Sequence, residues 1–249
     1  MARESANLIL LDNNLVSIID GVRLGRGGFE NLRKFVGYLF THNWAELGTF
    51  VAFIILEVPL PLSVMQVLAI DLGMDVLPSL SLIMEPPEKG VMDRPPTRKN
   101  RLLDTNVLLR SLYLGVIVSA IILVWAFRVW QDAGWSLGQK IVTDLGHYNR
   151  GTTAVMVGIM GAQLGNLFAT RTVRESALKL NPFRNKWLFL GIFGHLTLMV
   201  SIVYIPFLQL VFGTSNLTLQ DLAILYALAP LVFVLEELRK YVVRRRGRT

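Results

Sequence analysis

Six long apolar stretches, separated by short segments rich in charge or proline, dominate this chain of 249 residues. Each stretch has close to the roughly 20 residues that a helix needs to cross a lipid bilayer. Only 17% of the residues are charged, whereas about a quarter are charged in an average soluble domain. The sequence therefore predicts an all-α membrane protein with six transmembrane helices in a lipid bilayer, and it argues against a soluble enzyme. The expected spans cover residues 34–57, 61–84, 107–130, 152–170, 187–212 and 220–238.

The positions of the Lys and Arg residues predict how these spans are oriented. All basic residues except Arg128, Lys140 and Arg150 cluster around four places: before the first span, between the second and third, between the fourth and fifth, and after the sixth. Because basic residues stay on the cytoplasmic side during insertion, we expect a multi-pass protein of the plasma or cell membrane with both termini in the cytoplasm. This topology accounts for the net charge of +7, so we do not expect nucleic acid as a partner.

Residues 1–33 are unlike a membrane span. The apolar run Ala6–Leu11 predicts a buried strand, and the apolar residues from Leu15 to Val22 recur at helical spacing. A strand and a helix cannot bury a core alone, so we expect them to be the end of a larger soluble domain, with residues 34–249 forming the membrane domain. The glycines at 25, 27 and 28 indicate either a flexible joint or a loop.

Three acids lie inside the expected spans: Glu46 in the first, and Asp71 and Asp75 in the second. A charged side chain costs about 2.5 to 3.5 kcal/mol at the centre of a membrane on insertion scales, so such residues are functional candidates. Asn43 and Glu46 share one helix face, and so do Asp71 and Asp75. A hairpin of the two spans can bring these oxygen ligands together around metal ions or protons. The alternative is that the acids are protonated and hydrogen-bonded to neighbouring helices.

The backbone of the second span supports a cation site. Gly73 loosens the helix, and Pro78 has no N–H, which leaves the carbonyl of Met74 without its helical partner. Broken membrane helices commonly offer such carbonyls to cations.

Other polar residues in the spans allow two interpretations each. Gln163 and Asn166 in the fourth span are either further ligands or interhelical hydrogen-bonding groups, and the glycines at 158, 161 and 165 permit close helix approach. His42 either handles protons or packs as a hydrogen-bonding group. We expect His195, in the fifth span, to be structural.

Several spaced motifs occur in a fixed order along the chain. They are Asn7–Leu15, Gly25-Arg26, Phe29–Phe35, Asn43 with Glu46, Pro59–Leu62, Ile70–Pro78 and Glu85–Pro96. In this order they resemble the C-terminal half of the type II P-type cation-transporting ATPases. The similarity covers essentially the whole chain, more loosely after residue 101, and the segment Ile70–Gly73 is most similar to the sodium/potassium and proton/potassium pumps.

The resemblance implies that the six spans are the fifth to tenth helices of that family, and that residues 1–33 end its phosphorylation domain. Two departures, at Met74 where Thr is usual and at His42 where a small polar residue or, in the gastric proton pump, Lys is usual, leave the cation open among Na+, K+, H+ and Ca2+. The family's cation-ligand positions fall on Asn43, Glu46, Asp71 and Asp75, and those of its eighth helix fall on Gln163 and Asn166.

The family's motifs for ATP hydrolysis do not occur in this sequence. These are the aspartyl-phosphate motif, the magnesium-binding motif and the nucleotide domain, and the first four helices do not occur either. We therefore expect a fragment that cannot hydrolyse ATP alone, that uses ATP and Mg2+ only through those domains, and whose partner is the N-terminal half of the pump. The alternative is a non-pumping membrane scaffold or a remnant of a split or truncated pump gene.

Overall fold

The computed structural model describes residues 14–88, 90–93, 102–173 and 175–246. Within these ranges the chain is helical and contains no strand, so the predicted all-α fold is confirmed for this part. The strand expected at Ala6–Leu11 lies outside the described residues. The helices are α1 (Leu15–Ile55), α2 (Val64–Leu68), the π-helical turn η1 (Ala69–Met74), α3 (Val76–Ile83), α4 (Thr105–Gln131), α5 (Leu145–Thr170), the 3-10 turns η2 (Ala177–Lys179) and η3 (Pro182–Arg184), α6 (Lys186–Tyr204), α7 (Pro206–Phe212), α8 (Leu219–Tyr226) and α9 (Leu228–Arg246).

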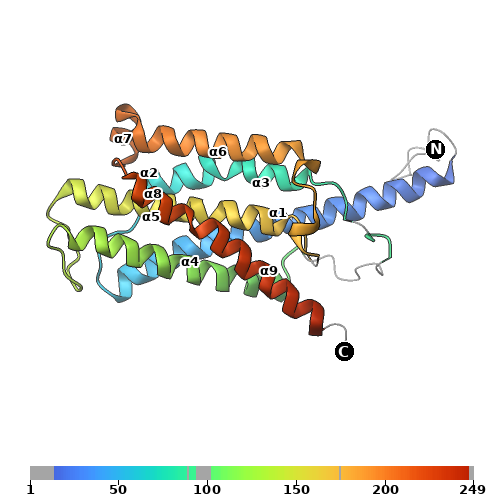
Figure 1. Ribbon diagram of the computed structural model, residues 1–249, viewed down its shortest axis with the longest axis horizontal. Coiled ribbons are helices and arrows are strands. Elements are labelled where there is room, and N and C mark those ends of the chain that lie inside the picture. Colours follow the sequence, from blue (N-terminus) through green and yellow to red (C-terminus); the bar gives the residue numbers. More distant parts are fainter. Residues whose placement is uncertain (1–13, 89, 94–101, 174, 247–249) are drawn as a thin grey trace, which may run out of the picture.

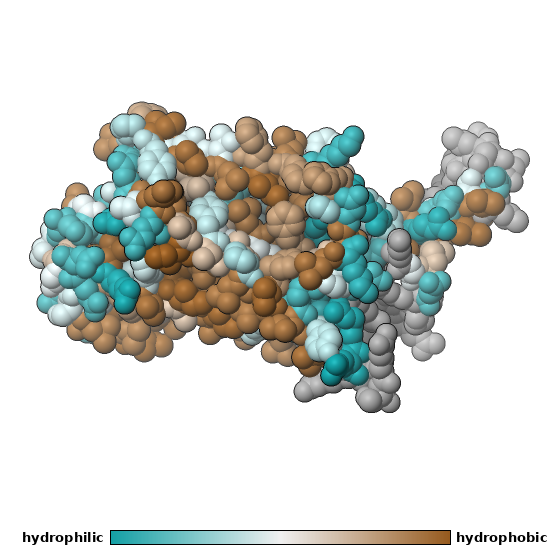
Figure 2. Space-filling model, in the orientation of Figure 1, coloured by the Kyte–Doolittle hydropathy of each residue, from teal (hydrophilic) through white to brown (hydrophobic). Residues whose placement is uncertain are grey.

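The long helices run side by side as a bundle around α5 (Figure 1). Most of α5 between Gly151 and Thr170 is buried, and α5 contacts α1, α4, α8 and α9. Figure 2 shows an apolar surface around the middle of the bundle and polar side chains gathered at its ends. This arrangement is typical of a bundle that crosses a bilayer, because apolar side chains face the hydrocarbon and charges stay outside it.

Five segments among the described residues are long and apolar enough to cross a membrane. α1, the expected first span, is not among them. It is long enough, but the polar residues His42, Asn43 and Glu46 lower the hydropathy of its otherwise apolar second half. The five qualifying segments are Val64–Ile83, Thr105–Gln131, Leu145–Thr170, Lys186–Tyr204 and Leu219–Arg245.

The glycine-rich part of α1 is helical. α1 continues without a break through Gly25, Gly27 and Gly28, so the interpretation of these glycines as a loop is wrong. Gly27 has a packing reason: a Cβ atom there would lie 2.7 Å from the Cγ atom of Pro87. The chain after α3 therefore rests directly on α1.

Two spans that the sequence predicts as continuous helices are interrupted in the structure. The stretch 187–212 divides at Ile205, whose extended backbone separates α6 from α7, and Pro206 occupies the first position of α7. Proline suits a first position, because the N–H that it lacks has no helical partner there. The stretch 220–238 divides at Ala227, between α8 and α9.

Candidate cation-binding site

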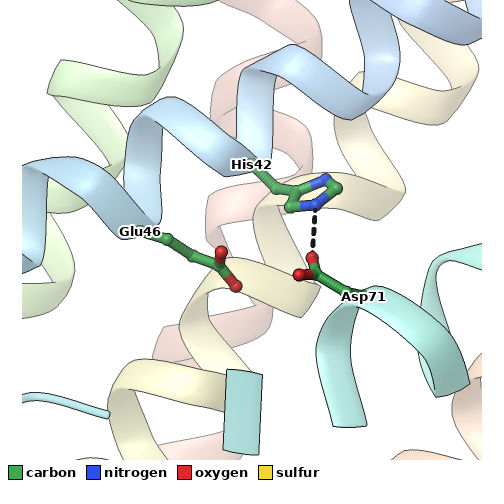
Figure 3. A group of neighbouring side chains, drawn as sticks. All are labelled: His42, Glu46 and Asp71. Carbon is green, nitrogen blue, oxygen red and sulfur yellow. Dashed lines mark hydrogen bonds and ion pairs between the residues drawn. The ribbon is translucent and has the colours of Figure 1, made fainter. Parts of the chain in front are cut away.

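The centre of the candidate site lies between α1 and the π-helical turn η1. His42 and Glu46 stand one helical turn apart on α1, and their side chains point toward Asp71 on η1 (Figure 3). One potential ligand atom from each of these three residues lies within 4.8 Å of the others. The His42 Nε2 atom is 3.0 Å from Asp71 Oδ1. The two spans of the predicted hairpin therefore do bring acidic groups together.

The π-helical geometry of η1 positions these acids. The backbone N–H of Asp75 donates to the carbonyl of Ile70, five residues earlier, at 3.0 Å. Single π-turns within α-helices occur frequently at functional sites. The carbonyl of Met74, which Pro78 leaves without a helical partner, lies 3.3 Å from His195 Nδ1. Because a carbonyl oxygen only accepts, His195 donates this bond, which is the structural role expected for it.

Asp75 is fully buried and surrounded by donors. The Tyr38 hydroxyl donates to Asp75 Oδ1 at 2.9 Å, and Gln163 Nε2 donates to Asp75 Oδ2 at 3.0 Å. His42 Nδ1 lies 2.6 Å from the same Oδ2 atom. Both ring nitrogens of His42 thus face carboxylates, and its Nδ1 atom also lies 2.9 Å from Gln163 Nε2.

Glu46 is the acid of this group with unused bonding capacity. It is 7% exposed, and its Oε1 atom has no hydrogen-bond partner. A buried carboxylate oxygen without a donor is costly unless a cation or proton satisfies it. Oxygens of Glu46 and Asp71 beside the His42 ring can therefore hold either a cation or a shared proton.

The structure joins most of the predicted site residues into one contiguous group. Gln163 contacts Asp75, and Asn166 contacts Gln163. Asn43 differs, because its side chain is exposed on α1 and lies outside this group. The residues brought together are His42, Glu46, Asp71, Asp75, Gln163 and Asn166.

Sequence reasoning missed two residues at this site, Tyr38 and Arg110. Tyr38 lies one turn before His42 on the same face of α1, and this spacing was a usable signal. Arg110 was assigned to a cytoplasmic basic cluster by its charge. Its position inside an apolar helix was a signal that it does more than mark the cytoplasmic side of the membrane. In the structure its guanidinium donates to Asn166 at 3.1 Å.

Comparisons with known proteins agree with this picture. Residues 59–242 match the family described as "Cation transporting ATPase, C-terminus". The chain is 32% identical to the Potassium-transporting ATPase alpha chain 2 of Oryctolagus cuniculus, over 98% of this chain and 25% of that protein. It is 31% identical to the Calcium-transporting ATPase type 2C member 2 of Mus musculus, over 96% of this chain and 24% of that protein.

A third relative is the Sodium/potassium-transporting ATPase subunit alpha-4 of Rattus norvegicus, which is 28% identical over 99% of this chain and 26% of its own length. The chain thus spans about a quarter of the length of the curated relatives that it matches. The family match covers most of the chain. The chain therefore belongs to the P-type cation-transporting ATPases and corresponds to their C-terminal membrane region.

Proposed function

We propose that this chain is the cation-binding transmembrane domain of an ATP-driven cation pump. In this proposal α1 is the first of six spans, residues 1–33 end the phosphorylation domain and stalk, and residues 34–249 form the transport domain. ATP hydrolysis occurs in the N-terminal half of the pump, which is the partner of this chain. The transported ion is Na+, K+, H+ or Ca2+, and the domain lies in the plasma membrane.

One observation carries the proposal: acidic oxygens of Glu46 and Asp71 meet at His42, beside a π-helical turn inside an apolar bundle. Such a group is expensive in a membrane, and it is retained where ions or protons pass. The contacts of the group come from two different helices, α1 and η1. A relative movement of these helices would therefore change the distances between these ligand atoms.

We assign the ligand role to Glu46, Asp71 and Asp75. His42 lies between Asp71 and Asp75 and serves as an internal counter-charge, so an arriving cation competes with its ring for their oxygens. This competition gives His42 a proton-handling role, since its ring loses its carboxylate partners when the cation binds. Asn43 is exposed and lies apart from this group.

Binding of radioactive ions by the full chain in lipid nanodiscs tests the proposal. We expect saturable uptake of 22Na+, 86Rb+ or 45Ca2+, and Asp75→Asn should weaken it by about tenfold or more, as replacement of groups around a metal commonly does. Asp132→Asn, at an exposed acid at the end of α4, is the matched control and should leave binding unchanged.

Two results of this binding experiment would contradict the proposal. In the first, the folded chain takes up none of these metal ions and shows no proton binding that Asp75→Asn changes, which favours the scaffold alternative. In the second, Asp75→Asn binds the ions as the unchanged chain does. Co-expression with an N-terminal half of a related pump adds a transport measurement, in which ATP-driven uptake should depend on Glu46, Asp71 and Asp75.

A further inference from the structure

A chain of hydrogen bonds leads away from the candidate cation site across the bundle to α4. It begins at Asp75 and passes through Gln163 and Asn166 on α5 to Arg110 on α4. Asp75, Gln163 and Asn166 are buried, and the Arg110 side chain is 13% exposed. Each link is a contact between side chains, and the side-chain nitrogens of Gln163 and Asn166 also donate to the backbone carbonyl of Tyr38, each at 3.4 Å.

The groups at the two ends of this hydrogen-bond chain determine which group donates in every bond between them. A guanidinium only donates, so the atom of Asn166 that faces Arg110, at 3.1 Å, must be its oxygen Oδ1. The hydroxyl of Thr170 also donates to this oxygen, at 3.0 Å. At the other end a carboxylate only accepts, so the atom of Gln163 that faces Asp75 Oδ2 must be its nitrogen.

The middle link agrees with both ends. The nitrogen of Asn166 donates to the oxygen of Gln163 at 2.9 Å. Turning the Asn166 amide over would place two donors 3.1 Å apart at Arg110, and turning the Gln163 amide over would place two acceptors 3.0 Å apart at Asp75. A buried polar contact of that kind is costly, so neither amide is free to rotate alone.

Arg110 is itself held in place by a second set of buried groups. Its Nε atom lies 2.8 Å from Oε1 of Glu236 on α9, and its side chain also donates to Thr170 at 2.7 Å. Glu236 is 1% exposed and has a second guanidinium partner, Arg239, at 2.7 Å. Arg239 has no contact with Asn166 or Thr170 among those that the structure shows, so its replacement removes a guanidinium from Glu236 and leaves the hydrogen-bond chain intact.

We propose that Arg110 is a positioning residue for the cation site, acting through Asn166 and Gln163 to keep N–H groups, and not amide oxygens, directed at Asp75. The inference rests on the proposed function, because it concerns how that site selects its ion. Gln163 and Asn166 then supply no oxygen to the cation, and their contribution is to orient the Asp75 carboxylate. A cation therefore meets carboxylate oxygens beside the His42 ring, and α5 contributes no amide oxygen to its coordination.

The orientation can be measured without any ion, by NMR of the full chain in nanodiscs with 15N-labelled glutamine. Gln163→Leu identifies the side-chain resonance of Gln163 by its loss. We expect Arg110→Met to shift this resonance and to raise its hydrogen-exchange rate by about tenfold or more, because an amide exchanges only when its hydrogen bond opens. The matched control Arg239→Met, which also removes one guanidinium from Glu236, should leave the rate within about twofold of the original.

Asn166→Leu interrupts the hydrogen-bond chain at its middle and keeps the Arg110–Glu236 pair. This variant replaces Arg110→Met if Arg110→Met does not fold. The proposal is overturned if the Gln163 amide keeps its resonance and exchange rate in the folded variant, or if Arg239→Met changes both as strongly as Arg110→Met does.

A double-mutant cycle on cation affinity tests the functional consequence. Arg110→Met should change the dissociation constant by about fivefold in the original chain and by less than about twofold in the Gln163→Leu background, because coupled residues are non-additive. Arg239→Met should have the same effect in both backgrounds. Equal effects of Arg110→Met in both backgrounds would show that Arg110 acts by charge or stability alone, and would overturn the proposal.

The two measurements separate this inference from the function on which it rests. If the original chain binds none of the ions, the proposed function fails, and the NMR experiment still decides the orientation of Gln163. If the chain binds ions but Gln163 is insensitive to Arg110, only the present inference fails.

Discussion

At the scale of single residues, the interior of this bundle contains several charged side chains that pair with charged groups from other segments. Glu85, at the end of α3, forms a two-pronged ion pair with Arg171 at the end of α5, with contacts of 3.0 and 3.2 Å. Asn185 donates to the same carboxylate at 2.9 Å. These three groups tie two connecting segments of the bundle together.

Arg171→Met should destabilise the fold by about 3 kcal/mol or more, because it leaves Glu85 buried without its charge partner. Both side chains of the pair are at most 3% exposed, so water cannot replace the lost guanidinium. Loss of the pair would be measured as a lower midpoint in an SDS-unfolding titration of the chain in bicelles.

The control for this prediction is Arg23→Met. Arg23 pairs with Asp20 at 3.1 Å, but both side chains are about half exposed, and such pairs contribute about 0 to 1 kcal/mol. Equal shifts of the midpoint for the two variants would mean that burial does not govern the strength of the Glu85–Arg171 pair.

The sequence predicted some residues of the candidate cation site and missed others for a physical reason. Spacing along one helix predicted that Asp71 and Asp75 share a face, and the proline at 78 predicted a backbone carbonyl without a helical partner. Spacing cannot show which residue from another helix fills such a gap. The contact of His195 with Met74 joins positions 121 apart, and that of Arg110 with Asn166 joins positions 56 apart.

At the scale of helices, close packing of α5 against α8 and α9 determines much of the bundle. A Cβ atom at Gly161 would lie 2.6 Å from the carbonyl oxygen of Leu225, and one at Gly165 would lie 2.0 Å from that of Ala229. The expectation that the glycines of this span permit close helix approach is therefore confirmed. α5 can carry Gln163 and Asn166 deep into the bundle because its glycine face lets these neighbours come so near.

Gly165→Ala should destabilise the bundle by about 1 to 3 kcal/mol, as overpacking commonly does. The clash is with backbone, which cannot rotate aside as a side chain can. Gly25→Ala in α1 is the opposite case, since nothing lies within 4 Å of a Cβ atom there. That variant should stabilise the helix by up to about 1 kcal/mol.

Unfolding midpoints of the two variants, measured in the same bicelles, check this prediction. A stabilising effect of Gly165→Ala would show that α8 and α9 can move away from α5 at little cost, and that the glycines are not required for packing.

Helix boundaries show the same division between what can and cannot be predicted. Hydropathy predicted the positions of the long helices closely, because membrane-spanning length is a property of the local sequence. It did not predict the breaks at Ile205 and Ala227 or the continuity of α1 through its glycines. These features depend on contacts with other parts of the chain. At position 27, for example, a glycine is required because Pro87 packs against it, and not because the helix bends there.

At the scale of the whole molecule, the connections between helices separate into two ends of the bundle (Figure 1). At one end lie the connections α1–α2 and α4–α5, joined by an ion pair of 3.1 Å between Lys140 and Glu57. At the other end lie the connections α3–α4 and α5–α6 and the C-terminal end of α9. The N-terminal half of α1 extends beyond this second end.

This arrangement makes the number of membrane crossings measurable at three exposed leucines. Leu24 lies in the protruding part of α1, Leu137 in the α4–α5 connection and Leu178 in the α5–α6 connection, and they are 65%, 66% and 75% exposed. The chain has no cysteine, so each position can be changed to Cys singly, without a background of other thiols.

If α1 crosses the membrane, Leu24→Cys and Leu178→Cys should react with a membrane-impermeant maleimide from the same side, and Leu137→Cys from the other. If α1 is counted, three crossings separate Leu24 from Leu137, namely α1, the α2–α3 span and α4, so these two positions lie on opposite sides. The crossing by α5 then returns the chain to the side of Leu24. Labelling of intact cells, compared with labelling after permeabilisation, measures this. Reaction of Leu24→Cys from the same side as Leu137→Cys would show that α1 does not span, and the carboxylate of Glu46 would then have to reach its partners from outside the bilayer.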